Sequence, residues 1–345
     1  MKDAGGESRP GRAIVMGPRS AGASRSGGCV IESVVVRVPG STSNLGAGFD
    51  CIGMAVDRWL TVTVRRDQSG NALPRLVRHG TLEALAAVRP ERDQIFLAFR
   101  SACTMTGTAV PPGLIFEADS DIPVGRGIGS SAAAAVAGAA LANALLGLRL
   151  DARALAGIGA TLEGHPDNVA PSIYGGAVLA LQGDPLTISA LEVHPSLVFV
   201  FAVPDFSVET KRARSALPNV VPHVTAVQAA ARSAALVRGL ATGEAALLVA
   251  GLDDVLHVPH RRALVRGYDV VSAAATAAGA FGATLSGSGS SIVAIAHADH
   301  APAVESAMAF AWQERGVAAE TFHTGRRVRG YEVQQVVESA RQWPG

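Results

Sequence analysis

The chain has 345 residues, 48% of them hydrophobic and 17% charged, so it is long enough for two ordinary domains with substantial cores. Its formal net charge of +1 argues against nucleic acid or an anionic membrane as partner, and no apolar run reaches the length of a membrane span. The three cysteines Cys29, Cys51 and Cys103 lie far apart, which excludes a disulfide framework or zinc site and indicates a reducing, cytoplasmic compartment.

Residues 1–28 differ from the rest of the chain because they are rich in Gly, Ser, Arg and Ala. They lack the apolar block of a secretory signal, and such a composition cannot bury enough apolar surface to become ordered. We therefore expect residues 1–30 to be a disordered extension, with Met16 as an alternative start. An organelle presequence, with few acids and several arginines, is the open alternative. The folded part is predicted to begin near Ile31.

Strands and helices alternate from that point, which predicts an α+β fold. In the first half we expect strands at residues 34–36, 60–65, 114–116 and 177–181, and helices at 93–106, 132–147 and 151–163. In the second half we expect strands at 197–203 and 291–296, and helices at 224–240, 262–279 and 301–315. Gly, Pro and polar residues gather at 183–195, so we divide the chain into domains 31–188 and 189–345.

The loop at residues 123–131 reads P-V-G-R-G-I-G-S-S and runs straight into the alanine-rich helix. Its alternate glycines permit positive φ, and a helix N-terminus presents unpaired N–H groups and partial positive charge to a phosphate. The spacing is neither that of a Walker loop nor that of a dinucleotide fingerprint. A glycine-rich turn with nothing bound is the alternative. The phosphate-binding candidates are Pro123, Val124, Gly125, Arg126, Gly127, Ile128, Gly129, Ser130 and Ser131.

Other polar constellations surround this loop in the sequence. Residues 39–50 form a polar, glycine-rich segment in which Asn44 and Asp50 either bind a ligand or form an Asx-type turn network. Residues 163–168 (E-G-H-P-D-N) gather two carboxylates, an imidazole and an amide, with metal, substrate and structural roles open. The basic clusters 210–214 and 257–262 either bind a carboxylate or phosphate or form solvated faces. A second glycine-rich loop spans 285–291.

Together, and in this order, the motifs resemble those of the GHMP small-molecule kinases, a family named after galactokinase, homoserine kinase, mevalonate kinase and phosphomevalonate kinase. Residues 123–131 resemble the family's second motif and residues 286–291 its third. The likeness covers about residues 33–335, and segments 39–50, 163–171 and 254–261 are most similar to the homoserine kinase branch.

The resemblance implies a two-domain GHMP kinase fold. Its N-terminal domain contains a left-handed β-α-β unit, contrary to the usual right-handed rule, and its C-terminal domain is ferredoxin-like. ATP would lie between the domains with its phosphates on residues 123–131, and Ser130 would help to hold Mg²⁺. The resemblance places Asn44, Asp50, His165, Asp167, Arg214 and Arg261 around homoserine, and Asn168, Thr210 and Arg214 in the catalytic set. The carboxylates suit an ammonium group, and the arginines suit a carboxylate or the moving phosphoryl group.

Two positions refine this interpretation. Asn168 stands where mevalonate kinase and galactokinase have an aspartate proposed as base, and an amide cannot take a proton. The resemblance therefore implies phosphoryl transfer by positioning and charge stabilisation, without an aspartate base. Gly157 stands where several members have a metal-binding glutamate. Glu163, the nearest acid, either replaces that ligand or merely ends its helix.

The expected activity is the ATP-dependent phosphorylation of L-homoserine to O-phospho-L-homoserine in threonine biosynthesis, with ATP and Mg²⁺. The alternatives are a GHMP kinase for another small amino alcohol and a non-catalytic nucleotide-binding sensor of the same fold. Metal-dependent ADP release with homoserine would separate enzyme from sensor, and a panel of alcohols would separate the two enzymes. The resemblance is also compatible with a homodimer.

Overall fold

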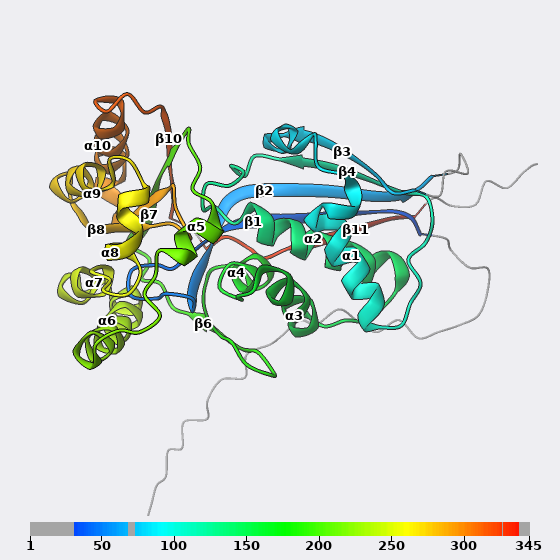
Figure 1. The fold of residues 1–345 in the computed structure, drawn as a ribbon, viewed down its shortest axis with the longest axis horizontal. Helices are drawn as coiled ribbons and strands as arrows, with labels where there is room; N and C mark the ends of the chain where they lie inside the picture. The colour runs from blue at the N-terminus through cyan, green and yellow to red at the C-terminus, as the bar shows by residue number, and fades with distance from the viewer. Residues whose placement is uncertain (1–30, 68–72, 326, 338–345) are drawn as a thin grey trace, which may run out of the picture.

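The computed structural model describes residues 31–67, 73–325 and 327–337. The extension predicted for residues 1–30 lies outside these ranges. Helices and strands are mixed along the described chain, which confirms the α+β class, and they form two sheets that lie one after the other along the longest axis of the molecule (Figure 1). Within the described ranges no helix has the length and apolar character needed to cross a membrane.

The larger sheet contains seven of the described strands, in the order β11-β1-β2-β4-β3, with β5 paired to β2 and β6 to β5. They are β1 (Ile31–Ser43), β2 (Ile52–Arg66), β3 (Arg75–Gly80), β4 (Leu114–Ser120), β5 (Ala177–Leu181), β6 (Thr187–Leu191) and β11 (Glu332–Val337). β3 and β4 are parallel, and α1 (Gln94–Met105) lies between them in the chain. This is a β-α-β crossover, and its left-handed sense stays a prediction.

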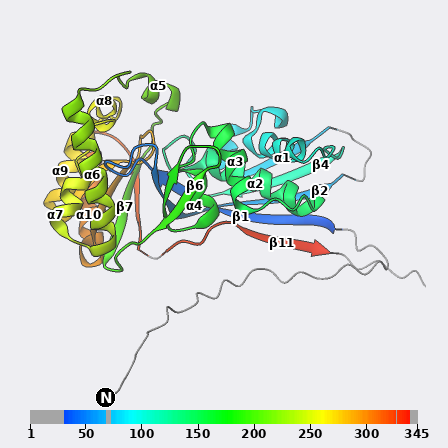
Figure 2. The same cartoon turned by 90° about the horizontal axis from the view of Figure 1, so that it is seen from below.

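Helices α1 to α4 cover one face of the larger sheet (Figure 2). α2 (Ser130–Leu146) is alanine-rich and largely buried between the sheet and its neighbours α1, α3 (Ala152–Glu163) and α4 (Val169–Tyr174). Small residues let these backbones approach, since a Cβ at Gly138 would lie 2.0 Å from the carbonyl oxygen of Ile95. The packing fixes the N-terminus of α2, where the glycine-rich loop ends.

The smaller sheet, within the described residues, has the order β10-β7-β9-β8. Its strands are β7 (Leu197–Pro204), β8 (Ala280–Leu285), β9 (Ile292–His297) and β10 (Ala319–Thr324), and its pairs are antiparallel. Helices lie between β7 and β8 in the chain, and α10 (Ala301–Gln313) lies between β9 and β10. This β-α-β-β-α-β order is that of a ferredoxin-like domain, as the resemblance to the family implies.

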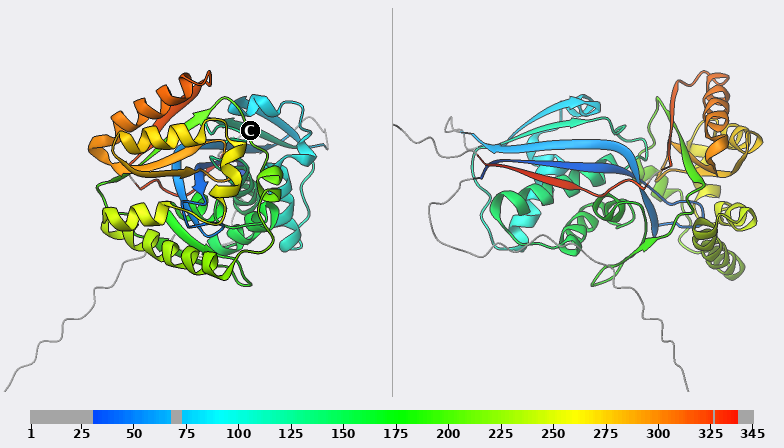
Figure 3. Two further views of the ribbon diagram at one scale, coloured as in Figure 1. Left: turned by 60° about the vertical axis from the view of Figure 1, so that its left-hand side comes forward. Right: turned by 180° about the vertical axis from the view of Figure 1, so that it is seen from behind.

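Both faces of the smaller sheet are covered. Every residue of β7 is buried, and because successive side chains of a strand point to opposite faces, both faces must be packed against other elements. Val198 and Val200 of β7 pack with α9 (Tyr268–Ala277) and α10 on one face. Phe199 and Phe201 point the other way, into the larger core, which also receives α6 (His223–Thr242) and α7 (Ala245–Leu252). Figure 3 shows α9 and α10 on one side of this sheet and α6 and α7 on the other. The two sheets therefore share part of one hydrophobic core.

The structure departs from the predicted elements in a few places. The helix predicted at 262–279 begins only at Tyr268, because Gly267 adopts φ 84° and Arg262–Leu264 form a short 3₁₀ turn. The segment 183–195, read as a break, contains β6, which pairs with β5. Strand β11 returns from the end of the described chain to pair with β1 of the larger sheet. The division into domains 31–188 and 189–345 stays a prediction. Strand β11 belongs by sequence to the second of these domains, yet it pairs with a strand of the first.

Candidate active site

A cavity of about 310 Å³ opens where the N-terminus of α2 faces the loops of the smaller sheet. Its walls come from the end of β1, the glycine-rich loop, the end of α3, the short helices α5 (Thr210–Ser215) and α8 (Val258–Arg261), and the loop after β8. Segments far apart in the sequence thus meet at one hollow. The predicted site residues that line it are Asn44, Gly125, Gly127, Gly129, Ser130, Ser131, Glu163, His165, Asn168, Thr210, Arg214 and Arg261.

The glycine-rich loop has the backbone that its sequence predicts. Gly125, Gly127 and Gly129 adopt φ values of 67°, 79° and 72°, which β-carbon-bearing residues rarely adopt. α2 begins at Ser130, so its first-turn N–H groups border the cavity. Lined in this way, the loop can receive phosphate oxygens through N–H groups and the helix dipole.

The second glycine-rich loop braces the first. The Ser286 hydroxyl donates a hydrogen bond to the Gly127 carbonyl oxygen at 2.6 Å, and the Ser291 N–H donates to the Arg126 carbonyl oxygen at 3.1 Å. The two backbones are so close that a Cβ at Gly127 would lie 2.1 Å from the carbonyl oxygen of Ser286. Residues 286–291 thus hold the conformation of the glycine-rich loop.

Oxygen atoms gather beside the start of α2. The Ser131 hydroxyl donates to Glu163 Oε1 at 2.5 Å, and Gln94 Nε2 donates to the same oxygen at 3.4 Å. Burial raises the pKa of Glu163 above its ordinary value, although the hydrogen bond from Ser131 opposes this. Gln94 Oε1 is buried and has no hydrogen-bond partner. Hydroxyl, amide and carboxylate oxygens are the ligands that Mg²⁺ accepts, so this donor set fits that ion.

Gly157 supplies no part of this oxygen cluster. It lies outside the cavity lining, and apart from its chain neighbours and the backbone of its own helix no atom lies within 4 Å of where its Cβ would be. The described residues hold no group of three or more His, Cys, Asp or Glu side chains able to bind a metal without other ligands. A cation at this place would thus need hydroxyl groups, water or phosphate oxygens besides Glu163.

Asn44 belongs to a turn network at the end of β1. Its Oδ1 accepts the Asp50 N–H at 2.8 Å and its Nδ2 donates to the Gly287 carbonyl oxygen at 3.0 Å. Asn44 and Asp50 adopt φ values of 57° and 54°, which short polar residues tolerate best. The Asx-type network that the sequence left open is present, and it leaves Asn44 at the cavity wall.

Two arginines of the smaller domain line the cavity, and they differ in how their guanidinium groups are paired. Both terminal nitrogens of Arg214 contact the Asp50 carboxylate, at 3.0 and 2.9 Å. Arg261 is almost fully buried, donates from Nε to the Ala213 carbonyl oxygen at 3.0 Å, and has a buried Nη1 without a partner. Burial, and next the charge of Arg214, lower the pKa of Arg261. An anion reaching Arg261 would therefore meet an unsatisfied donor.

His165 and Asn168 form the opposite wall, and the buried Asp167 lies behind His165. The hydrogen bond to Asp167 raises the pKa of His165, and the other oxygen of Asp167 is buried without a partner. Asn168 Oδ1 accepts from the Ser41 hydroxyl at 3.1 Å, while its Nδ2 donates to the Ser43 hydroxyl at 2.8 Å. Two serines of β1 thus fix the amide, which faces the cavity.

Some predicted residues lie beside the cavity and not on its wall. Asp50 and Asp167 reach it through Arg214 and His165, as described above. Pro123, Val124 and Arg126 line a neighbouring cavity of about 770 Å³, and Ile128 is buried. Sequence reasoning missed Gln94, Ser43 and Ser288 on the wall, because only their position in the fold brings them there. Thr210 Oγ1 lies 3.4 Å from Ser288 Oγ.

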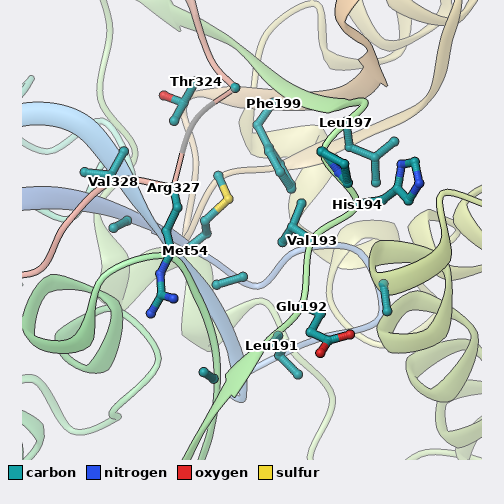
Figure 4. Close-up of a pocket in the computed structure, with 17 residues that line it drawn as sticks. Met54, Leu191, Glu192, Val193, His194, Leu197, Phe199, Thr324, Arg327 and Val328 are labelled. Carbon is teal, nitrogen blue, oxygen red and sulfur yellow. The ribbon is translucent and has the colours of Figure 1, made fainter. Parts of the chain in front are cut away.

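A larger cavity, of about 840 Å³, lies elsewhere between the two sheets (Figure 4). Its wall is mainly apolar, and Met54, Val193 and Phe199 are among its apolar side chains. Its ionisable residues are Arg327, Glu192 and His194. None of the residues that the sequence singled out lines it. Size alone thus does not locate the chemistry, which needs the glycine-rich loop and the opposed charges of the smaller cavity.

Comparison with known proteins places these features in one family. The model of the GHMP kinases N-terminal domain matches residues 94–176, and that of the GHMP kinases C-terminal domain matches residues 222–314. The chain is 43% identical over 280 residues to a homoserine kinase of Gloeobacter violaceus, covering 80% of this chain and 92% of that protein. It is 39% identical over 291 residues to a homoserine kinase of Trichormus variabilis, covering 84% and 95%.

Solved structures show the same likeness. A homoserine kinase from Cytophaga hutchinsonii superposes with a TM-score of 0.79 at 30% identity, covering 88% of this chain and 98% of that one. A mevalonate kinase from L. major superposes with a TM-score of 0.62 at 16% identity, covering 83% and 94%. The second comparison shows a common fold only.

Proposed function

The chain belongs to the GHMP kinase family and is related to its homoserine kinases, and from this premise we propose how its cavity carries out their reaction. The protein transfers the γ-phosphoryl group of ATP to the hydroxyl of L-homoserine and releases ADP and O-phospho-L-homoserine, a step of threonine biosynthesis. The observation that carries the substrate assignment is a buried guanidinium nitrogen of Arg261 without a partner, in the cavity that also receives the N-terminus of α2.

Homoserine is a zwitterion with a hydroxyl at the far end of a short chain. Its carboxylate would satisfy Nη1 of Arg261, since a buried donor without a partner is costly and an anion removes that cost. Its ammonium would lie toward Asp50 and the free oxygen of Asp167, the carboxylates that flank the wall. Asn44 and His165 would complete the contacts from the cavity wall.

Phosphoryl transfer at this site needs no carboxylate base. Asn168 cannot accept a proton, and its amide is held by Ser41 and Ser43 so that it orients the substrate. A loose transition state demands little proton removal, so the homoserine hydroxyl can pass its proton to a phosphate oxygen. Arg214 and Thr210 lie on α5 opposite the loop, where they would stabilise the moving phosphoryl group.

ATP would extend from the glycine-rich loop to the neighbouring cavity of about 770 Å³. That cavity is lined by Pro123 and Val124 of the loop and by Thr81, Ala84 and Leu85, a surface with room for the nucleoside. When bound, Mg²⁺ would neutralise charge on the phosphates. Ser130 and Glu163 would hold it, with Ser131 and Gln94 beside them.

The test is the release of ADP by purified protein with MgATP and L-homoserine, with the product identified by ³¹P NMR as an alkyl phosphate. A panel of serine, threonine and longer amino alcohols at matched concentration defines the acceptor. Homoserine is expected to give the highest kcat/KM, and Arg261→Gln should reduce that advantage over a neutral alcohol. Equal rates with all acceptors would contradict the homoserine assignment.

The free thiols Cys51 and Cys103 support the further proposal of a cytoplasmic location.

A further inference from the structure

Arg126 stands in the glycine-rich loop, where a cation invites a direct role in phosphate binding, but its guanidinium has other contacts. Nε donates to the Pro204 carbonyl oxygen at 3.1 Å, and Nη2 donates to the Asp205 carbonyl oxygen at 2.8 Å. Nη1 donates to the Val124 carbonyl oxygen of its own loop at 2.8 Å. All three nitrogens are thus committed to backbone oxygens, and no ion pair of Arg126 is found among the described residues.

Two of the three acceptors, Pro204 and Asp205, belong to the other domain. Pro204 ends β7, and Asp205 follows it, with its N–H bonded to the Ala318 carbonyl oxygen at 2.9 Å. The next residue, Phe206, accepts a hydrogen bond from the Ser290 hydroxyl. Residues 204–206 are therefore held by the smaller sheet and the second glycine-rich loop, and they give Arg126 a fixed point of attachment.

Only the guanidinium shape explains the set of contacts. Its planar fork presents N–H groups in fixed directions, so one side chain can reach three carbonyl oxygens on two segments at once. The flanking residues Gly125 and Gly127 carry no side chain that could restrict the loop backbone, so its conformation depends on contacts with other segments, which are those with residues 286–291 and those of Arg126. A loop of this kind needs an external contact to hold its N–H groups in one arrangement before the nucleotide arrives.

We propose that Arg126 is a positioning residue that fixes the glycine-rich loop to the end of β7, so that nucleotide affinity depends on the shape of its side chain and not on its charge. The proposal goes beyond the function above, on which only its kinetic readout rests. Arg126→Lys keeps the positive charge and loses the fork, whereas Arg126→Met loses both and keeps much of the length. The two variants therefore separate positioning from electrostatic attraction.

The experiment measures the Kd of MgADP by calorimetry, the KM values for ATP and homoserine, and the Tm of each protein. Both variants are expected to weaken MgADP binding and raise the KM for ATP by roughly tenfold, the size of one or two lost hydrogen bonds. The KM for homoserine should stay within about twofold of wild type. The control is Arg100→Met, on the exposed surface of α1, which should change none of these values.

Three results would overturn the proposal. Wild-type affinity in Arg126→Lys together with loss in Arg126→Met would assign the effect to charge. Wild-type affinity in both variants would leave the contacts without consequence for the nucleotide. Equal loss of both substrates with a lowered Tm would mean general destabilisation. If wild-type protein binds MgADP and does not phosphorylate homoserine, the proposed function fails, while the calorimetric comparison still decides the role of Arg126.

Discussion

Asp50 and Arg214 face each other across the two domains and form a two-pronged ion pair, with nitrogen-to-oxygen distances of 3.0 and 2.9 Å. Asp50 precedes β2 of the larger sheet, and Arg214 lies on α5, which follows β7 of the smaller one. The two groups proposed to serve opposite charges of the reaction are therefore bound to each other. The ammonium of an entering homoserine can take the place of Arg214 at Asp50, which frees Arg214 for the moving phosphoryl group and keeps the charges balanced.

Arg214→Lys is expected to lower kcat/KM for homoserine by an amount corresponding to about 1.5–3 kcal/mol, because lysine lacks the fork that matches Asp50 and a substrate oxyanion. Steady-state kinetics on the purified variant measures this. Arg212→Lys is a matched control, since Arg212 is exposed on the same helix and should tolerate the change. Unchanged homoserine dependence and turnover in Arg214→Lys would reduce the residue to a surface charge.

Gly127→Ala should lower ATP turnover much more than Gly125→Ala. Both glycines have positive φ, but a Cβ at Gly127 meets the Ser286 carbonyl oxygen at 2.1 Å, whereas at Gly125 the nearest atom is a Ser207 carbon at 3.7 Å. Displacing the loop removes well-aimed donors, each worth roughly 10²–10³ in rate. Gly127→Val should abolish turnover. Circular dichroism checks that the variants remain folded, and equal activity of the two alanine variants would remove the contact with Ser286 from the argument.

Glu163→Gln is expected to separate activity from stability. Turnover should fall and require more Mg²⁺, because a neutral amide replaces an anionic ligand. The free energy of unfolding at pH 7 should rise, since burial raises the pKa of Glu163 and its charged form is therefore disfavoured in the folded state. Above pH 4.5 the carboxyl of Glu163 loses its proton more readily in the unfolded wild-type protein than in the folded one, which disfavours folding. Below pH 4.5 both states keep the proton, so the gain in stability from Glu163→Gln should vanish there.

Urea unfolding across pH and Mg²⁺ titration of activity at fixed ATP provide the two measurements for Glu163→Gln. Superimposed Mg²⁺ curves for wild type and variant would contradict the ligand role and leave Glu163 as the end of α3 only. A parallel variant, Gln94→Leu, removes the neighbouring amide without changing the charge, so it should affect Mg²⁺ dependence less.

His165→Gln should cost stability on the acid side. The hydrogen bond to Asp167 raises the pKa of His165 above 6.5, so the favourable interaction is fully present below pH 6.5 and is lost as pH rises through the folded-state pKa. The difference in unfolding free energy between wild type and variant should therefore be larger at pH 6 than at pH 9. A difference independent of pH would show that protonation of His165 contributes nothing.

His257 provides the opposite case in the same protein. It is buried beneath Phe49, and burial lowers its pKa, so the folded state resists its protonation. His257→Gln should therefore relieve a loss of stability that wild type suffers as pH falls below 6.5. Denaturant curves for the two histidine variants should diverge in opposite directions with pH, and parallel curves would contradict both assignments.

Sequence patterns predicted what local chemistry determines. The helices predicted at 93–106 and 151–163 are present as α1 and α3, capped by Asp93 and Asp151 and with α3 ended by Gly164, because capping depends on a few neighbouring residues. Edge strands such as β6 and β10 were missed, since their half-exposed residues carry little alternation and their partners lie elsewhere in the chain. The likeness to a known family, and not periodicity, identified the residues of the cavity.

The pairing within the site could not be read from the sequence for the same reason. Nothing near Asp50 in the chain indicates that Arg214 occupies it, because 164 residues separate them. The commitment of Arg126 to the Pro204 carbonyl oxygen likewise depends on a backbone acceptor, which leaves no trace in side-chain composition. Motifs therefore identified which residues gather, and the fold decides which atoms each one contacts.

Strand β11 has a consequence for the order in which the protein can be made. It pairs with β1, so the first described strand of the chain receives its outer neighbour from the last one. During synthesis one edge of β1 has no partner strand until more than 280 intervening residues have emerged from the ribosome. An unpaired strand edge can form hydrogen bonds with other chains. The sheet that supports the glycine-rich loop is thus completed only after all strands of the smaller sheet have been synthesised.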